Sequence, residues 1–176
     1  MISKIYKPLF FIGIAAMALF FIITESGCGV YKLKDVSIPD SIKVVRVKYI
    51  ENKAPYVNPT LAPALTEKLR QKIVSNTRLK QTNSENADWD IEAIITGYSF
   101  STAGVSNQQA NRNKLTVNIN VVVDDKKAGK RGQPQSVSRN FEYAGSMSLQ
   151  QAEKSLESEM LRDLSDDIFN RIFSNW

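Results

Sequence analysis

The chain has 176 residues, which fits a single domain or a single domain preceded by a targeting segment. Its formal net charge of +5 is mildly basic, and it indicates either a mixed soluble surface or attraction to an anion such as lipid phosphate or nucleic acid. The chain contains no histidine and one cysteine. It therefore lacks the commonest general base and zinc ligand, and it cannot form an internal disulfide or a cysteine-bound metal cluster.

The N-terminus has the pattern of a secretion signal. A short basic segment ends at Lys7, and an uncharged, largely apolar run of fifteen residues extends from Leu9 to Ile23. A transmembrane helix needs about 20 apolar residues, whereas the core of a signal peptide needs roughly 7–15. We therefore expect residues 1–27 to be a cleavable signal peptide.

Small residues stand directly before the single cysteine. Ser26-Gly27-Cys28 resembles the lipobox of bacterial lipoproteins, although Glu25 departs from that pattern, which has an aliphatic residue there. The resemblance implies that Cys28 is the lipid attachment site, with acyl chains such as palmitate anchoring the protein. Residues 28–40 are then expected to form a lipidated tether, and the mature chain carries a charge of +4 once two lysines and one glutamate leave with the leader.

The first part of the mature chain predicts a strand, a loop, a helix and a second short strand. In the first strand, Val45, Val47 and Tyr49 share the apolar face by alternation. The helix carries a leucine or isoleucine every four residues, which makes one apolar stripe. The expected bounds are 42–50 for the strand, 51–59 for the loop, about 60–76 for the helix with Asn58 or Thr60 as its cap, and 78–80 for the short strand.

The second part predicts three strands and a long helix. Alternation is strongest between Leu115 and Val123, where every second residue is apolar. The expected elements are a strand at 89–102, a polar connection at 106–113, a strand at 115–123, a hairpin loop at 124–134, a strand at 135–144 and a helix at 149–173 capped by Ser148. The order predicts one α+β domain at 41–176, a two-layer sandwich with two helices packed on a roughly four-stranded mixed sheet.

Two loops contain candidate binding residues. The hairpin loop carries four cationic residues, which form either a solvated turn or contacts to an anionic lipid or an acidic partner: Lys126, Lys127, Lys130 and Arg131. Arg112 and Lys114 are counted separately, because strand pairing puts them at the opposite end of the sheet. The loop at 51–59 contains prolines and an aromatic residue, and it serves either as a helix cap or as a partner contact through Asn52, Pro55, Tyr56 and Asn58.

No catalytic constellation is present in the sequence. It has no phosphate-binding glycine loop, no Ser-His pair and no metal-ligand spacing. The neighbouring carboxylates Asp124-Asp125 and Asp166-Asp167 point apart on a strand or a helix, so neither pair converges on a substrate. We therefore expect no enzyme activity, no catalytic or metal-binding residue and no cofactor.

Several segments together resemble the LptE-like lipopolysaccharide-assembly lipoproteins of Bacteroidetes-type bacteria. They are Gly27–Tyr31, Tyr49–Leu61, Glu92–Tyr98 and Asp167–Trp176. The resemblance implies two helices on a four-stranded sheet and a non-enzymatic protein that plugs the outer-membrane β-barrel LptD, with which it passes lipopolysaccharide to the outer leaflet. Of the family's functional residues, only the lipid attachment site carries over, onto Cys28.

Two hypotheses follow. The first is an outer-membrane lipoprotein that lies on the periplasmic side or within a barrel lumen, with an LptD-like β-barrel and lipopolysaccharide as partners and no nucleic acid. The alternative is a stand-alone periplasmic lipoprotein that binds an anionic lipid or glycan, and it is motivated by the mild positive charge and the basic loop.

Overall fold

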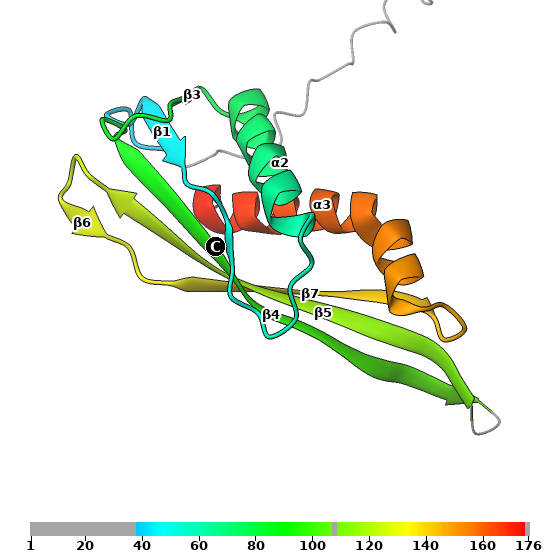
Figure 1. Ribbon diagram of the computed structural model, residues 1–176. Coiled ribbons are helices and arrows are strands. Elements are labelled where there is room, and N and C mark those ends of the chain that lie inside the picture. The colour runs from blue at the N-terminus through cyan, green and yellow to red at the C-terminus, as the bar shows by residue number, and fades with distance from the viewer. Residues whose placement is uncertain (1–37, 107–108, 175–176) are drawn as a thin grey trace, which may run out of the picture. The chain divides into compact units, whose positions relative to one another are not determined.

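A computed structural model describes residues 38–106 and 109–174 (Figure 1). The expected signal peptide, Cys28 and most of the expected tether lie outside the described residues, so their assignment stays a prediction. The elements in order are β1 (Val44–Val47), β2 (Glu51–Asn52), α2 (Leu61–Asn76), β3 (Lys80–Gln81), β4 (Trp89–Ser106), β5 (Gln109–Asp125), β6 (Lys130–Arg131), β7 (Gln135–Ala144) and α3 (Leu149–Phe173).

The strands form one mixed sheet. Its main path is β3-β1-β4-β5-β6, with β2 also pairing with β4 and β7 also pairing with β5. β1 runs parallel to β3 and β4, whereas β5 runs antiparallel to β4, β6 and β7. β1 and β2 pair with the same side of β4, and β6 and β7 pair with the same side of β5. The seven strands therefore fill five positions across the sheet, against the four expected.

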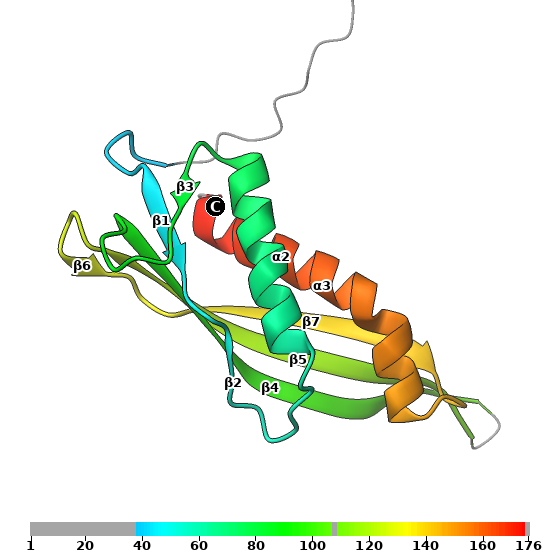
Figure 2. The ribbon, with the colours of Figure 1, turned by 45° about the horizontal axis from the view of Figure 1, so that its top comes forward.

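Both helices cover the same face of this sheet, which gives two layers (Figures 1 and 2). The core lies between them, and alternate strand residues such as Ile91, Ile95 and Val117 are fully buried there. The helices contribute their stripes to the same cluster, including Leu65, Leu69, Ile73, Met160, Leu164 and Ile168. The expected α+β sandwich is confirmed.

Side chains fix the start of each helix. At α2, the side-chain oxygen of Asn58 accepts hydrogen bonds from the backbone N–H groups of Thr60 and Leu61 at 3.0 and 3.2 Å, so it satisfies donors that have no helical partner. At α3, Ser148 and Gln151 form a reciprocal capping box. Ser148 caps α3 as the sequence predicts. Of the two candidates at α2, Thr60 stands at the N-cap position without a side-chain cap bond, and Asn58 supplies the hydrogen bonds.

Three local predictions were wrong. Tyr49 is 60% exposed, because the chain leaves the β1 ladder after Val47, and the next residue, Ile50, is buried and donates its N–H to Thr66 Oγ1 of α2 at 3.1 Å. The connection expected at 106–113 instead belongs to a long β4–β5 hairpin, whose ladder continues to Ser106 opposite Gln109. The loop expected at 124–134 contains β6, which pairs with the end of β5.

Candidate functional site

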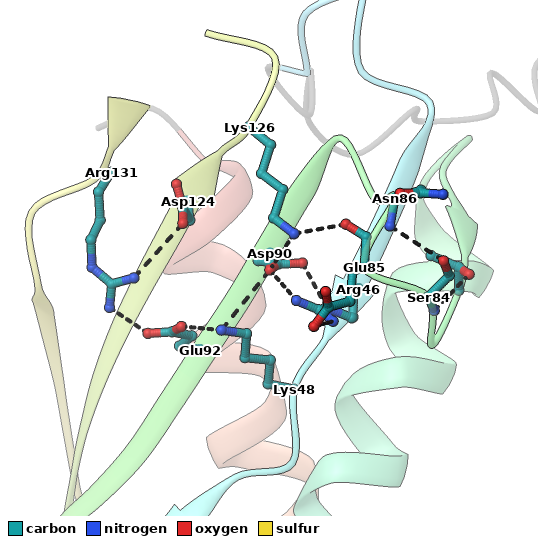
Figure 3. Close-up of polar contacts among 11 residues, drawn as sticks. Arg46, Lys48, Ser84, Glu85, Asn86, Asp90, Glu92, Asp124, Lys126 and Arg131 are labelled. Atoms are coloured by element: carbon teal, nitrogen blue, oxygen red, sulfur yellow. Dashed lines mark hydrogen bonds and ion pairs between the residues drawn. The ribbon is translucent and has the colours of Figure 1, made fainter. Parts of the chain in front are cut away.

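A cluster of ion pairs lies on the sheet face opposite the helices, at the end where β1 and β4 begin. Strand register brings it together: Arg46 stands opposite Asp90, Asp90 opposite Asp124, and Asp124 opposite Arg131. Residues directly opposite on neighbouring strands point to the same face, so their side chains meet. Figure 3 shows the cationic side chains directed at Asp90 and Glu92.

Asp90 is at the centre of this cluster. Its side chain is only 2% exposed. Arg46 Nε donates to Asp90 Oδ1 at 2.8 Å, and Lys126 Nζ lies 3.0 Å from Asp90 Oδ2, with Lys48 Nζ at 3.9 Å. Burial alone raises the pKa of Asp90, but the hydrogen bonds from Arg46 and Lys126 outweigh it and hold the pKa below its usual value.

Glu92 forms the second half of the cluster. Its carboxylate accepts hydrogen bonds from Arg131 and Lys48, and these lower the pKa of Glu92 to about 2. Arg131 also lies 3.8 Å from Asp124, and Arg46 lies 3.8 Å from the exposed Glu85. Four cations therefore face four carboxylates, and the cluster is close to neutral.

The cluster engages most of the expected basic loop. Lys126 and Arg131 contact Asp90 and Glu92, and Lys127 Nζ lies 3.3 Å from Asp88. Within residues 38–106 and 109–174, Lys130 is the member of this loop without an ion pair. Because three charges are compensated inside the molecule, the loop presents less positive charge to an anion than its sequence suggests. Its role as a lipid contact stays a prediction.

The loop at 53–60 follows β2, lies beside the middle of β4 and contacts α3. The ring of Tyr56 stacks on Tyr98 with 5.4 Å between centroids, and both phenols donate to Glu153, at 3.3 and 2.9 Å. Burial, followed by the neighbouring Glu153 carboxylate, raises the pKa of Tyr56. Phe100 meets both rings edge-on and completes an aromatic cluster.

The four expected partner-contact residues of this region differ in exposure. Asn58 is buried as the helix cap, and Asn52 is half-buried and accepts from the Ala54 N–H at 3.1 Å. Pro55 is exposed, and Tyr56 is 37% exposed beside it. The path of the loop therefore leaves Pro55 and Tyr56 accessible to a partner. The side chains of Asn52 and Asn58 fix the loop conformation through hydrogen bonds to its backbone.

Beyond the ion-pair cluster, the open face of the sheet is mostly polar and uncharged, with Ile94 and Val122 among its polar side chains and Lys114 and Glu142 toward the β4–β5 turn. The short hydroxyl and amide side chains of this surface come from three neighbouring strands: Ser99, Ser101, Thr116, Asn118, Asn120, Ser136, Ser138 and Asn140. They alternate with core residues on the other face, and Thr116 Oγ1 bonds Asn140 Oδ1 at 2.8 Å. Sequence reasoning identified the alternation but not this continuous surface, because the surface exists only once the register is known.

Within 38–106 and 109–174, no helix combines the length and apolar character that a membrane crossing requires. The same residues contain no cluster of three or more metal-ligating side chains.

Comparison with known families gives one match. Residues 42–172 match the model of the LptE family, which is described as lipopolysaccharide-assembly. The match covers most of the chain. The chain belongs to the LptE family. The chain is therefore a member of a family of lipopolysaccharide-assembly lipoproteins.

Solved structures agree on the fold. A minor lipoprotein from Acinetobacter baumannii superposes with a TM-score of 0.51 at 15% identity, over 75% of this chain and 93% of that one. Rare lipoprotein B from Shewanella oneidensis gives 0.50 at 17% identity, over 72% and 92%. A hypothetical protein from Chlamydia trachomatis gives 0.52 at 10% identity, over 76% and 99%. Comparison with curated protein sequences returns no match.

Proposed function

We propose that this LptE-family protein is a non-enzymatic partner of an LptD-like β-barrel in the outer membrane, held there by acyl chains on Cys28. In this role it plugs the barrel and supports insertion of lipopolysaccharide into the outer leaflet. Membership of the LptE family supports a role in lipopolysaccharide assembly, and the expected lipobox supports lipid anchoring through Cys28.

The observation that carries the plug role is the open face of the sheet. Barrel lumens are lined by polar side chains. A surface of short, uncharged hydroxyls and amides can exchange hydrogen bonds with such a wall without burying unpaired charge. Part of the open face has that composition across β4, β5 and β7, with the ion-pair cluster on one side of it and Arg112, Lys114 and Glu142 on the other. The exposed Pro55 and Tyr56 add a second contact beside the same sheet.

The experiment is affinity purification of the tagged chain from native outer membranes in mild detergent, followed by mass spectrometry. The expected result is a large β-barrel in near-equal amount. Recovery of acylated protein alone would move the function to the stand-alone alternative.

A matched pair of double variants tests the open face itself. Ser136→Arg with Ser138→Arg puts two charges on the open face, whereas Ser75→Arg with Ser158→Arg puts the same change on exposed helix positions. The first pair is expected to lower barrel recovery at least about tenfold, because buried unpaired charge costs several kcal/mol. Equal recovery from both pairs would show that the open face does not touch the barrel.

The stand-alone alternative rests on the basic loop, and the internal ion pairs of Lys126, Lys127 and Arg131 weaken its case. Its test is Lys126→Glu with Lys127→Glu. If this double variant still binds anionic vesicles, the basic loop is not the binding site in the stand-alone alternative.

A further inference from the structure

A pocket of about 460 Å³ lies where the described domain begins, beside the edge of the sheet formed by β1 and β3. Two apolar side chains, three cationic side chains and one carboxylate line it: Ile42, Val44, Lys43, Arg78, Lys80 and Asp40. Apolar surface combined with an excess of cations suits an amphiphile with an anionic headgroup.

The charges of this pocket are less compensated than those of the basic loop. Arg78 pairs with Asp40 at 2.7 Å, and Asp40 is the one carboxylate of the lining. Lys43 and Lys80 are exposed and form no ion pair within the described part of the chain. Lys43 directly precedes β1 and Lys80 begins the neighbouring β3, and the Lys80 N–H donates to the Lys43 carbonyl at 2.8 Å. Two ammonium groups are therefore available at one pocket.

The pocket is also close to the tether along the chain. Arg78 Nη2 donates to the carbonyl of Ile38, the first described residue, at 2.9 Å. Nine residues lie between Cys28 and Ile38, and the ten residue steps from one to the other span at most about 35 Å when fully extended. Acyl chains on Cys28 would thus keep the pocket within one tether length of a membrane surface, and Lys32 and Lys34 in that tether are also cationic.

We propose that this pocket binds the phosphate of an anionic phospholipid in the leaflet that holds the acyl chains. Lys43 and Lys80 contact the phosphate, Arg78 fixes the start of the tether, and the apolar side chains receive the upper part of an acyl chain. The site rests on the proposed lipid anchor. It orients the domain at the membrane, because a second contact limits how the domain rotates about its lipid attachment.

The experiment uses the full acylated chain in lipid nanodiscs of phosphatidylcholine with a minor fraction of phosphatidylglycerol. Native mass spectrometry of the released protein measures the phosphatidylglycerol that stays bound. Wild type is expected to retain it, and Lys43→Gln with Lys80→Gln is expected to lower the bound fraction at least about fivefold. Lys68→Gln with Lys154→Gln makes the same charge change on exposed helix positions and should retain the lipid.

The outcomes are distinct. An intact mass without acyl chains overturns the anchor and this assignment with it, whereas acylated protein that retains no phosphatidylglycerol overturns the pocket alone. Equal loss from both double variants shows non-specific attraction and also overturns it. Lipid A in place of phosphatidylglycerol separates two sources of phosphate, and stronger retention of lipid A overturns the phospholipid assignment. Unchanged melting by circular dichroism confirms that the variants fold.

Discussion

Two regions of the sheet are held together by different interactions. The tether end, where β1, β3 and β4 begin, is held on its open face by the ion pairs around Asp90 and Glu92. The region that we call the far end lies beside the middle of β4, at the loop 53–60 and the start of α3, and it is held by stacked aromatic rings and two phenol hydrogen bonds to Glu153. The first depends on carboxylates staying charged, and the second on phenols staying neutral. The two regions should therefore fail under opposite conditions.

The largest expected effect is at the centre of the tether end. Asp90→Ala, in the mature chain with Cys28→Ser, leaves Arg46 and Lys126 without their buried partner. Breaking a buried ion pair from one side costs about 3–5 kcal/mol, and urea unfolding measures it. Glu85→Ala is the control, because Glu85 is 90% exposed and touches the same Arg46 at 3.8 Å. If Glu85→Ala lowers the free energy of unfolding as much as Asp90→Ala does, burial does not determine the strength of these ion pairs.

Acid is the next way to break the tether end. The folded pKa of Glu92 is about 2 against an ordinary value of 4.5, so its stabilisation is present above pH 4.5 and is lost as the pH falls toward 2. The pKa values of Asp88 and Asp90 are also lowered and act in the same direction. Because the side chain of Glu92 is 22% exposed, solvent weakens its ion pairs, and we expect its charge to contribute about 2 kcal/mol to the free energy of unfolding at neutral pH.

The matched variant for this prediction is Glu92→Gln, which should be about 2 kcal/mol less stable than wild type at pH 7 and equal to it near pH 2. Urea unfolding at a series of pH values provides the measurement. A stability difference that stays constant with pH would mean that the loss comes from packing and not from charge.

Alkaline conditions should affect the far end. Burial, followed by Glu153, raises the pKa of Tyr98, which therefore stays protonated after the same group ionises in the unfolded chain near pH 10. Stability is then lost as the pH rises above 10, by about 1 kcal/mol per unit. Tyr98→Phe keeps the ring and removes that slope. Measured by urea unfolding at pH 9 and pH 11, a slope that Tyr98→Phe leaves intact would exclude Tyr98 as its source.

The same contrast explains what the sequence could and could not predict. Helices, caps and most strands follow from local patterns, so Ser148 was identified with its role and Asn58 was one of two candidates for the cap of α2. Arg46 and Lys48 were visible as one polar face of a strand, and Asp90 and Glu92 alternate in the same way. These two pairs of side chains meet because of the parallel register of β1 and β4, and no local sequence pattern specifies that register. The uncharged part of the open face and the Tyr56–Tyr98 stack depend on register and on loop path in the same way.

The smallest effect concerns an ion pair outside both clusters. Arg112 Nη1 and Glu142 Oε2 lie 2.8 Å apart, a distance similar to those around Asp90, but their side chains are 67% and 53% exposed. Solvent screens exposed pairs, so Arg112→Gln should change the free energy of unfolding by less than about 0.5 kcal/mol. Urea unfolding in low and high salt checks this. A loss comparable to that of Asp90→Ala would mean that contact distance, and not burial within a network, sets the strength of ion pairs on this sheet.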